Sequence, residues 1–384
     1  MKLLALAWAY SNYKYGGEVV PIYELTKALA KQGVEVTVVT PTVALQGDPP
    51  DGVRLVQTKP DVRVGFTGVN KARMIRAVRR LLKEERYDVC HLISQITSFP
   101  ILLRPFLTSV CYMEAHGAGS GAGHHLRELY GMRGRAFASK AAEFGISTVL
   151  NAIGVREEAT LRGSDVIIAR QKGAVAFFQK YSRVEYIPFG VNVKRFHPGT
   201  ADGSILFVGN LLPYKGPDVL LRAFAKIAGE FPESELRLAG EGPMRPELEH
   251  LASELGIGKR VRFLGLLSYE ELPKYYAQAS AFCLPSKGEG YASVNLEAMA
   301  SGVPPVTSVK ITGVTDYLED GVSGFILPPE DIDGFAQKLR LLLSDRTVRD
   351  RMGRAAWEKA QGFSWERIAS SHLSLYQGLV DPVA

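Results

Sequence analysis

Short apolar runs alternate with amphipathic stretches along most of this chain. The first run, residues 3–8, leads through Gly16-Gly17 into an amphipathic stretch that ends at Gly33. Strands that are apolar at every position, rather than at alternate positions, are typical of parallel sheets covered by helices on both faces. The same pattern predicts strands at 34–40, 54–57, 89–93, 109–113 and 166–169, and a helix around 70–86. The first half is therefore predicted to be an α/β structure.

A stretch rich in proline and glycine at 186–199 precedes a second half with the same pattern. Strands are predicted there at 205–208, 235–239, 261–264, 281–284 and 304–307. We predict two Rossmann-like doubly wound domains, at 1–187 and 188–364, and a C-terminal helix at 365–384 that packs back toward the first. Ligands of such sheets bind beyond the carboxyl ends of the strands, so we expect two facing domains to form a cleft.

Length and composition exclude several classes of protein. The 384 residues suffice for two or three domains, and 46% apolar and 22% charged residues exclude an extensively disordered or fibrous chain. Because no uncharged apolar run reaches about 18 residues, we expect no membrane-spanning helix. The apolar start resembles a signal peptide without a small-residue cleavage site, which favours a buried strand. Cys90, Cys111 and Cys283 show neither disulfide nor metal-binding spacing, which predicts a reduced, cytoplasmic protein.

The net charge of +6 is unevenly distributed. Residues 1–190 carry 25 Lys and Arg against 16 Asp and Glu, a net of +9, and the remainder carries a net of −3. In the helix predicted around 70–86, one face is apolar and the opposite face is basic. The apolar residues are Met74, Ile75, Val78, Leu81 and Leu82, and the basic ones are Arg73, Arg76, Arg80 and Lys83. Two interpretations are open: a solvated basic face, or a docking surface for anionic lipid or a polyanionic acceptor.

Three strand–turn–helix junctions have the composition of anion-binding sites. They are Gly16-Gly17, residues 209–216 with Lys215, and residues 288–297 with Ser293 as the expected N-cap. Backbone N–H groups and the positive end of a helix favour a negative ligand at such junctions. None matches the dinucleotide or Walker pattern, and glycine at these turns often serves packing alone.

Two glutamates make the third junction more specific. Glu289 lies in the loop and Glu297 about one turn into the helix, so both side chains can face one site. Carboxylates accept hydrogen bonds from sugar hydroxyls, and two of them beside a phosphate site suggest a sugar nucleotide as ligand. The alternative is a pair of surface glutamates.

Residues 286–304 resemble the E-x7-E signature of retaining family 4 glycosyltransferases, the glycosyl transferases group 1. Further segments resemble this family in the same order: 16–17, 88–91, 114–117, 207–216, 238–243, 261–265, 313–324 and 363–365. The resemblance covers nearly the whole chain. It implies a GT-B fold, in which the first domain binds the acceptor and the second binds a nucleotide-sugar donor, here expected to be a UDP- or GDP-sugar.

The resemblance also implies roles for individual residues. Lys215 would hold the donor diphosphate and Glu297 the ribose, while His116 and Glu289 would act at the transferred sugar. The backbone after Glu289 would contribute to donor binding, as would two glycines near the distal phosphate; these residues are Gly290, Tyr291, Ala292, Ser293, Val294, Gly16 and Gly17. The resemblance implies no divalent metal, cofactor or nucleic acid, and the leaving phosphate itself would serve as base for the incoming hydroxyl. Some members glycosylate lipid carriers at the cytoplasmic face of a membrane, so the expected location is cytoplasmic, with a peripheral position at the inner face of the cytoplasmic membrane as one option.

Two positions depart from the family pattern. Asn210 stands where the family usually has an arginine of the diphosphate clamp, and Asn192 replaces an aspartate of the linker. An amide binds phosphate more weakly than a guanidinium does, and Arg170 or Lys172 are candidates to compensate. The alternative function is therefore a non-catalytic nucleotide-sugar-binding or regulatory protein. An epimerase or phosphorylase is disfavoured, because neither type of signature is present.

Three other features have simpler structural explanations. Asp331 and Asp333 precede an amphipathic helix, which predicts helix capping rather than a metal-binding pair. His124 and His125 follow a glycine-rich stretch, and adjacent histidines rarely bind one metal, so a mobile acceptor loop is favoured over a zinc site. His91 ends a predicted strand and is either a packed core residue or a functional one.

Overall fold

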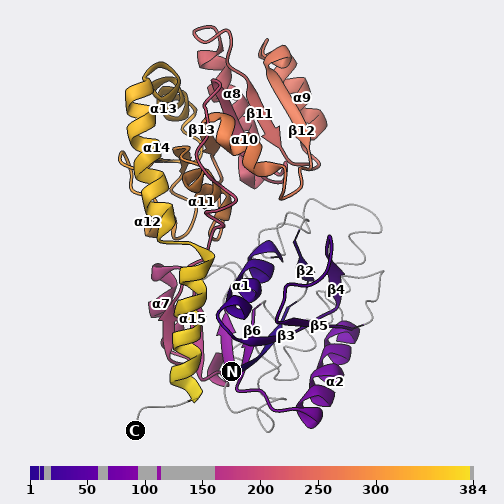
Figure 1. Ribbon diagram of the computed structural model, residues 1–384. Coiled ribbons are helices and arrows are strands. Elements are labelled where there is room, and N and C mark those ends of the chain that lie inside the picture. The colour runs from indigo at the N-terminus through magenta and orange to yellow at the C-terminus, as the bar shows by residue number, and fades with distance from the viewer. Residues whose placement is uncertain (8, 13–18, 59–67, 94–109, 114–160, 381–384) are drawn as a thin grey trace. The chain divides into compact units, whose positions relative to one another are not determined.

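The computed structural model describes residues 1–7, 9–12, 19–58, 68–93, 110–113 and 161–380. These residues form two compact units (Figure 1), one of Met1–Pro188 with Ile368–Ala384 and one of Phe189–Arg367. Each unit contains a large parallel sheet, as the apolar pattern predicts. The predicted linker around 186–199 includes the point where the chain passes from the first unit to the second.

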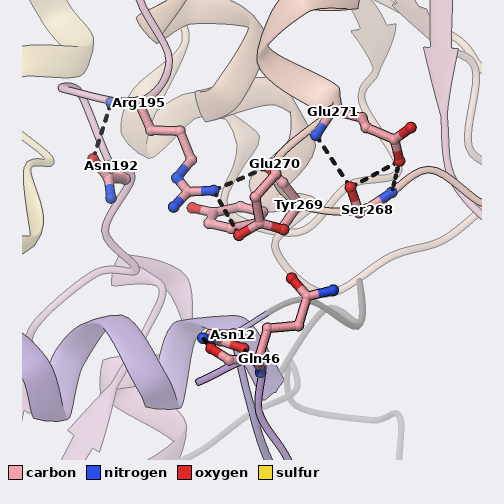
Figure 2. Close-up of polar contacts among 8 residues, drawn as sticks. All are labelled: Asn12, Gln46, Asn192, Arg195, Ser268, Tyr269, Glu270 and Glu271. Carbon is pink, nitrogen blue, oxygen red and sulfur yellow. Dashed lines mark hydrogen bonds and ion pairs between the residues drawn. The ribbon is translucent and has the colours of Figure 1, made fainter. Parts of the chain in front are cut away.

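The first unit is built on a seven-stranded sheet with the order β5-β3-β1-β6-β7-β8-β9. Its strands are β1 (Lys2–Leu6), β3 (Glu35–Thr40), β5 (Val53–Gln57), β6 (Val89–Leu92), β7 (Val110–Met113), β8 (Val166–Ala169) and β9 (Val184–Tyr186). A separate parallel pair consists of β2 (Ala9–Ser11) and β4 (Thr42–Ala44). Asn12 joins the segments that follow this pair: its side chain donates to Gln46 O at 3.0 Å and accepts from Gln46 N at 2.9 Å (Figure 2).

The helices described in this unit are α1 (Val19–Lys31), α2 (Gly68–Glu84), α7 (Lys172–Phe178) and most of α15 (Trp365–Val380). Met74, Val78 and Leu81 of α2 are completely buried, which confirms the predicted apolar face. Phe178 of α7 lies in the same core cluster, so α2 and α7 cover the same face of the sheet.

The outer face of α2 is basic, with one correction to the predicted set. Arg76, Arg80 and Lys83 are exposed, whereas Arg73 is partly buried. Arg79, which is not in the predicted set, is also exposed. The charges are weakly compensated within the helix, since Arg80 Nε lies 3.8 Å from Glu84 Oε1.

Helix α15 packs on the first unit through a buried cluster of polar aromatic side chains. The hydroxyl of Tyr376 lies 2.7 Å from Nδ1 of His91, a residue of β6, and both side chains are fully buried. His372 is also fully buried, and its ring nitrogen Nδ1 bonds to Ile368 O at 2.7 Å. His91 is therefore a packed core residue, the first of the two interpretations given for it. Burial lowers the pKa of both histidines, so both are neutral at pH 7.

The second unit contains a six-stranded sheet with the order β12-β11-β10-β13-β14-β15. Its strands are β10 (Ser204–Val208), β11 (Leu236–Ala239), β12 (Val261–Gly265), β13 (Ala279–Leu284), β14 (Pro305–Ser308) and β15 (Phe325–Leu327). Its helices are η2 (Pro213–Lys215), α8 (Pro217–Ala228), α9 (Arg245–Glu254), η3 (Gly258–Arg260), α10 (Leu272–Gln278), α11 (Ser293–Ala300), α12 (Val314–Tyr317), α13 (Ile332–Ser344) and α14 (Arg346–Gln361). The edge strand β15 was not predicted, nor was β9 at the edge of the other sheet.

Polar side chains fix several turns of this unit, one of which was predicted from the sequence. Asp331 Oδ1 accepts from Gly334 N at 2.8 Å and caps α13, which confirms the capping interpretation. In the linker, Asn192 Oδ1 accepts from Arg195 N at 3.1 Å, so the asparagine provides a capping oxygen itself (Figure 2). The Arg195 guanidinium lies 4.7 Å from the Tyr269 ring centre and bonds to Glu270 at 3.1 Å.

Candidate functional site

The candidate site lies in the loops that follow β10 and β13 of the second unit. Two glycines let neighbouring loops approach closely, because a Cβ on Gly240 would collide with the carbonyl oxygen of Gly209. Gly216 has a φ of 69°, and a Cβ there would collide with Pro285 O. Both positions need glycine, because each combines a close approach of neighbouring backbone with a positive φ, which is 149° at Gly240.

Hydrogen bonds hold the loop that carries Lys215 against the loop that carries Glu289. Tyr214 O accepts from Ser286 Oγ at 3.0 Å and from Lys287 N at 2.6 Å. Glu289 is fixed on its other side, since its N–H donates to Lys310 O at 3.3 Å. The two loops are therefore held in place by hydrogen bonds to backbone carbonyls.

Lys215 and Glu289 form an ion pair in which both side chains are largely enclosed, with 14% and 12% of their surfaces exposed. Burial lowers the pKa of Lys215 to about 8, because desolvation disfavours the ammonium. The neighbouring carboxylate favours the charged form and works against this shift. Glu289 Oε2 is buried and bonds to nothing else among the described residues. The site thus combines a cation with a spare carboxylate oxygen.

Glu297 lies on α11 and is only 7% exposed. Its Oε2 accepts a hydrogen bond from the hydroxyl of Tyr276 at 3.0 Å, which fixes the carboxylate. Tyr276, on α10, is fully buried and packs against Phe196 and Phe282. Since neither Glu289 nor Glu297 is a surface residue, the alternative of two surface glutamates is wrong.

The start of α11 differs from the prediction. Ala292, not Ser293, is the N-cap residue, and it has no side chain able to accept a hydrogen bond from the first turn. Ala292 also has a φ of 53°, the one positive φ found for a residue other than glycine in the described ranges. Ser293 is the first helical residue, and the Val294 side chain is buried, so Val294 can contribute to a ligand site through its backbone.

Asn210 is exposed, and its side chain bonds to no other residue that the structure describes. Within the first unit, the Arg170 guanidinium donates to Ile187 O and Pro188 O, both at 3.1 Å. Lys172 lies over the ring of Tyr186 at 5.6 Å. Gly16, Gly17, His116, His124 and His125 lie outside the described residues, as does the segment 114–117.

The residues that support this site were not predicted from the sequence. Tyr276, Asn295 and Tyr317 are fully buried polar residues around α11. Tyr276 is an aromatic residue on the apolar face of a helix, and nothing in the neighbouring sequence indicates its contact with Glu297.

The described residues include no group of three His, Cys, Asp or Glu arranged to bind a metal. None of the described helices is long and apolar enough to span a bilayer.

Comparison with known families gives matches along most of the chain. Residues 194–359 match the family described as glycosyl transferases group 1, and residues 16–180 match the glycosyl transferase 4-like domain. The chain belongs to the glycosyltransferase family described as glycosyl transferases group 1. The resemblance based on the E-x7-E segment is therefore confirmed.

Several curated relatives share one name. The D-inositol 3-phosphate glycosyltransferase of Nocardioides sp. is 29% identical over 94% of this chain and 85% of its own length. The protein of the same name from Kribbella flavida is 35% identical over 53% of each chain. With several such relatives the aligned region spans about half of their length, for example 47% of the Nocardia farcinica protein.

Solved structures of similar fold belong to the GT-B class, which confirms the predicted fold class. Sucrose-phosphate synthase from Thermosynechococcus elongatus has a TM-score of 0.74 at 22% identity, covering 98% of both chains. Anabaena HepE, solved in complex with UDP, has a TM-score of 0.71 at 18% identity, covering 98% of this chain and all of its own. At these identities the likeness concerns the fold alone.

Proposed function

We propose that this chain is a retaining, metal-independent glycosyltransferase that moves a sugar from a nucleotide-diphosphate sugar to a hydroxyl acceptor. The observation that carries the proposal is the enclosed pair of Lys215 and Glu289 near the uncapped start of α11. A cation and helix N–H groups attract a diphosphate, and a carboxylate accepts hydrogen bonds from sugar hydroxyls. The site therefore has groups for both parts of a sugar nucleotide.

Each residue has a distinct part in the proposed reaction. Lys215 and the positive end of α11 stabilise the charge that develops on the leaving diphosphate, which is the task of a metal ion in other transferases. Glu297 binds the ribose hydroxyls with a carboxylate that Tyr276 holds in position. Glu289 binds the transferred sugar. The leaving phosphate takes the proton of the acceptor hydroxyl. The oxygen of this hydroxyl bonds to the anomeric carbon of the sugar on the face from which the phosphate leaves, so the anomeric configuration is retained.

The proposed donor is a UDP- or GDP-sugar, and the proposed acceptor is an anionic polyol or a lipid-linked or polyanionic acceptor. HepE was solved with UDP and with UDP-glucose, which supports a uridine nucleotide. The relatives are named for D-inositol 3-phosphate, a polyol that carries negative charge. The net charge of +9 in residues 1–190 favours an acceptor of this kind.

Nucleotide release from a panel of UDP-, GDP- and ADP-sugars tests catalysis. The wild-type protein should release nucleotide slowly without acceptor, and Lys215→Ala should abolish this release by removing the cation of the site. Lys287→Ala is the matched control, because the Lys287 side chain pairs with Glu330 at 3.3 Å instead. Binding of a sugar nucleotide without any release would instead support the second candidate, a non-catalytic binding protein, which the exposed Asn210 in place of a clamp arginine favours.

Calorimetry on two glutamate variants tests the assigned roles. Glu297→Ala should weaken binding of the nucleotide alone, because the ribose loses its partner. Glu289→Ala should weaken binding of the sugar nucleotide while leaving the free nucleotide bound at least as tightly, because Lys215 loses a competing carboxylate. Equal affinities of both variants and the wild type for both ligands would contradict the roles.

Vesicle flotation tests the proposed contact with an anionic membrane. Binding to anionic but not neutral vesicles should be salt-sensitive and should weaken on charge reversal of Arg76 and Arg80, each charge contributing up to ~1 kcal/mol. Arg222→Glu with Arg346→Glu, at exposed positions of the second unit, is the matched control. Equal flotation with both lipid compositions at low salt would leave the basic face of α2 as a solvated surface.

A further inference from the structure

A buried chain of hydrogen bonds ends at the peptide group that precedes Ala292. The Tyr317 hydroxyl donates to Tyr291 O at 2.9 Å, and Asn295 Nδ2 donates to the Tyr317 hydroxyl at 3.0 Å. We propose that Tyr317 and Asn295 are positioning residues that orient the peptide groups after Glu289 for donor binding. The proposal rests on the proposed function, because it names residues that prepare the same site.

The conformation of Ala292 needs such a restraint. Its φ of 53° and ψ of 65° are left-handed, a region that residues with a Cβ rarely occupy because of a steric cost. The carbonyl of Tyr291 belongs to the peptide unit whose rotation sets the φ of Ala292. A hydrogen bond that holds this carbonyl therefore holds the left-handed turn.

The same bond determines where the Ala292 N–H points. In a trans peptide the C=O and N–H groups point in opposite directions. Because Tyr317 binds the Tyr291 carbonyl in the interior, the Ala292 N–H is directed away from Tyr317. This N–H donates to none of the residues that the structure describes. It is thus left available for a ligand oxygen at the start of α11.

The donor and acceptor of each hydrogen bond in this series follow from the backbone carbonyls at its ends, which can only accept. Thr307 Oγ1 gives its proton to Leu284 O at 3.1 Å, and Tyr317 gives its proton to Tyr291 O. Both hydroxyls are then left with acceptor capacity, so the amide nitrogen of Asn295 faces them, at 3.3 Å from Thr307 Oγ1. Burial raises the pKa of Tyr317, so its hydroxyl keeps its proton and remains a donor.

This series of hydrogen bonds links the loop after Glu289 to rigid elements of the second unit. Leu284 ends β13, Thr307 lies on β14, and Tyr317 ends α12. The Tyr317 ring also contacts the Tyr291 ring, with centres 5.1 Å apart. The turn at Ala292 is therefore set by strands and a helix rather than by the loop itself.

The test removes one oxygen atom. Tyr317→Phe should weaken UDP binding about tenfold in calorimetry, because the left-handed turn must be re-formed when the ligand binds. Tyr87→Phe is the matched control: its buried hydroxyl donates to Thr37 Oγ1 at 3.2 Å in the first unit, and its loss should leave UDP affinity unchanged. Adding Ala292→Gly to Tyr317→Phe should restore most of the affinity, because glycine reaches the left-handed region without the Cβ cost. A purely structural role of Tyr317 predicts no such rescue.

Crystal structures of the variants separate this proposal from the proposed function. In Tyr317→Phe, residue 292 should leave the left-handed region, whereas in Tyr87→Phe it should stay there. An unchanged φ at residue 292 in Tyr317→Phe would overturn the proposal whether or not UDP binds. Absence of UDP, GDP and ADP binding by the wild type, together with the expected change at residue 292, would overturn the proposed function and leave the positioning of the turn supported.

Discussion

Nucleoside diphosphate binding should weaken about tenfold between pH 7 and pH 9 through Lys215. Burial lowers the pKa of Lys215 to about 8, so in the free protein the ammonium form falls from about 90% at pH 7 to about 10% at pH 9. Only the ammonium attracts the diphosphate, so at pH 9 binding must take up a proton. The tenfold loss corresponds to about 1.4 kcal/mol of binding free energy.

Calorimetric titrations of UDP at pH 7, 8 and 9 and constant ionic strength measure this effect. Lys215→Arg provides the comparison, because arginine stays charged throughout this range and the ligand ionises identically with both proteins. The extra loss of affinity in the wild type then reports Lys215 alone. Lys287→Arg should keep the pH dependence of the wild type, because the Lys287 side chain is engaged with Glu330.

Equal pH profiles for the wild type and Lys215→Arg would refute the reasoning. Either Lys215 would not contact the diphosphate, or the Glu289 carboxylate would hold it charged at pH 9. Glu289→Gln separates these two cases, because loss of the carboxylate lowers the pKa of Lys215 and should make the pH dependence appear only if Lys215 binds the ligand.

Three further predictions concern stability. Burial lowers the pKa of His372 to about 3. Below pH 6.5 His372 is therefore protonated in the unfolded chain but not in the folded protein, and the folded state loses stability as the pH falls. In urea titrations the loss between pH 7.5 and 5 should be about 2 kcal/mol smaller for His372→Gln than for the wild type or for His197→Gln, an exposed control. Gly240→Ala should destabilise by more than ~2 kcal/mol because its Cβ would collide with backbone, whereas Gly229→Ala has open space. Asp331→Ala should cost about 1 kcal/mol in the same assay through loss of the helix cap.

The sequence by itself determined the features that depend on neighbours along the chain. The apolar spacing in α2 predicts the burial of Met74 and Val78, because a helix brings residues three or four apart to one face. Asp331 caps α13 through a bond to a residue three positions on, so its role was also visible locally. The edge strands β9 and β15 have three residues each, too few for a reliable pattern.

Only the tertiary structure decided how the candidate site is arranged. Nothing local predicts that Lys215 meets Glu289 or that Tyr276 holds Glu297, because these partners are far apart in sequence and meet only when the loops and helices of the second unit pack together. The resemblance to a family named Lys215 and both glutamates, but it gave no sign of Tyr317. The lowered pKa of Lys215 has the same origin, since desolvation depends on everything that surrounds a side chain and not on its neighbours in the sequence.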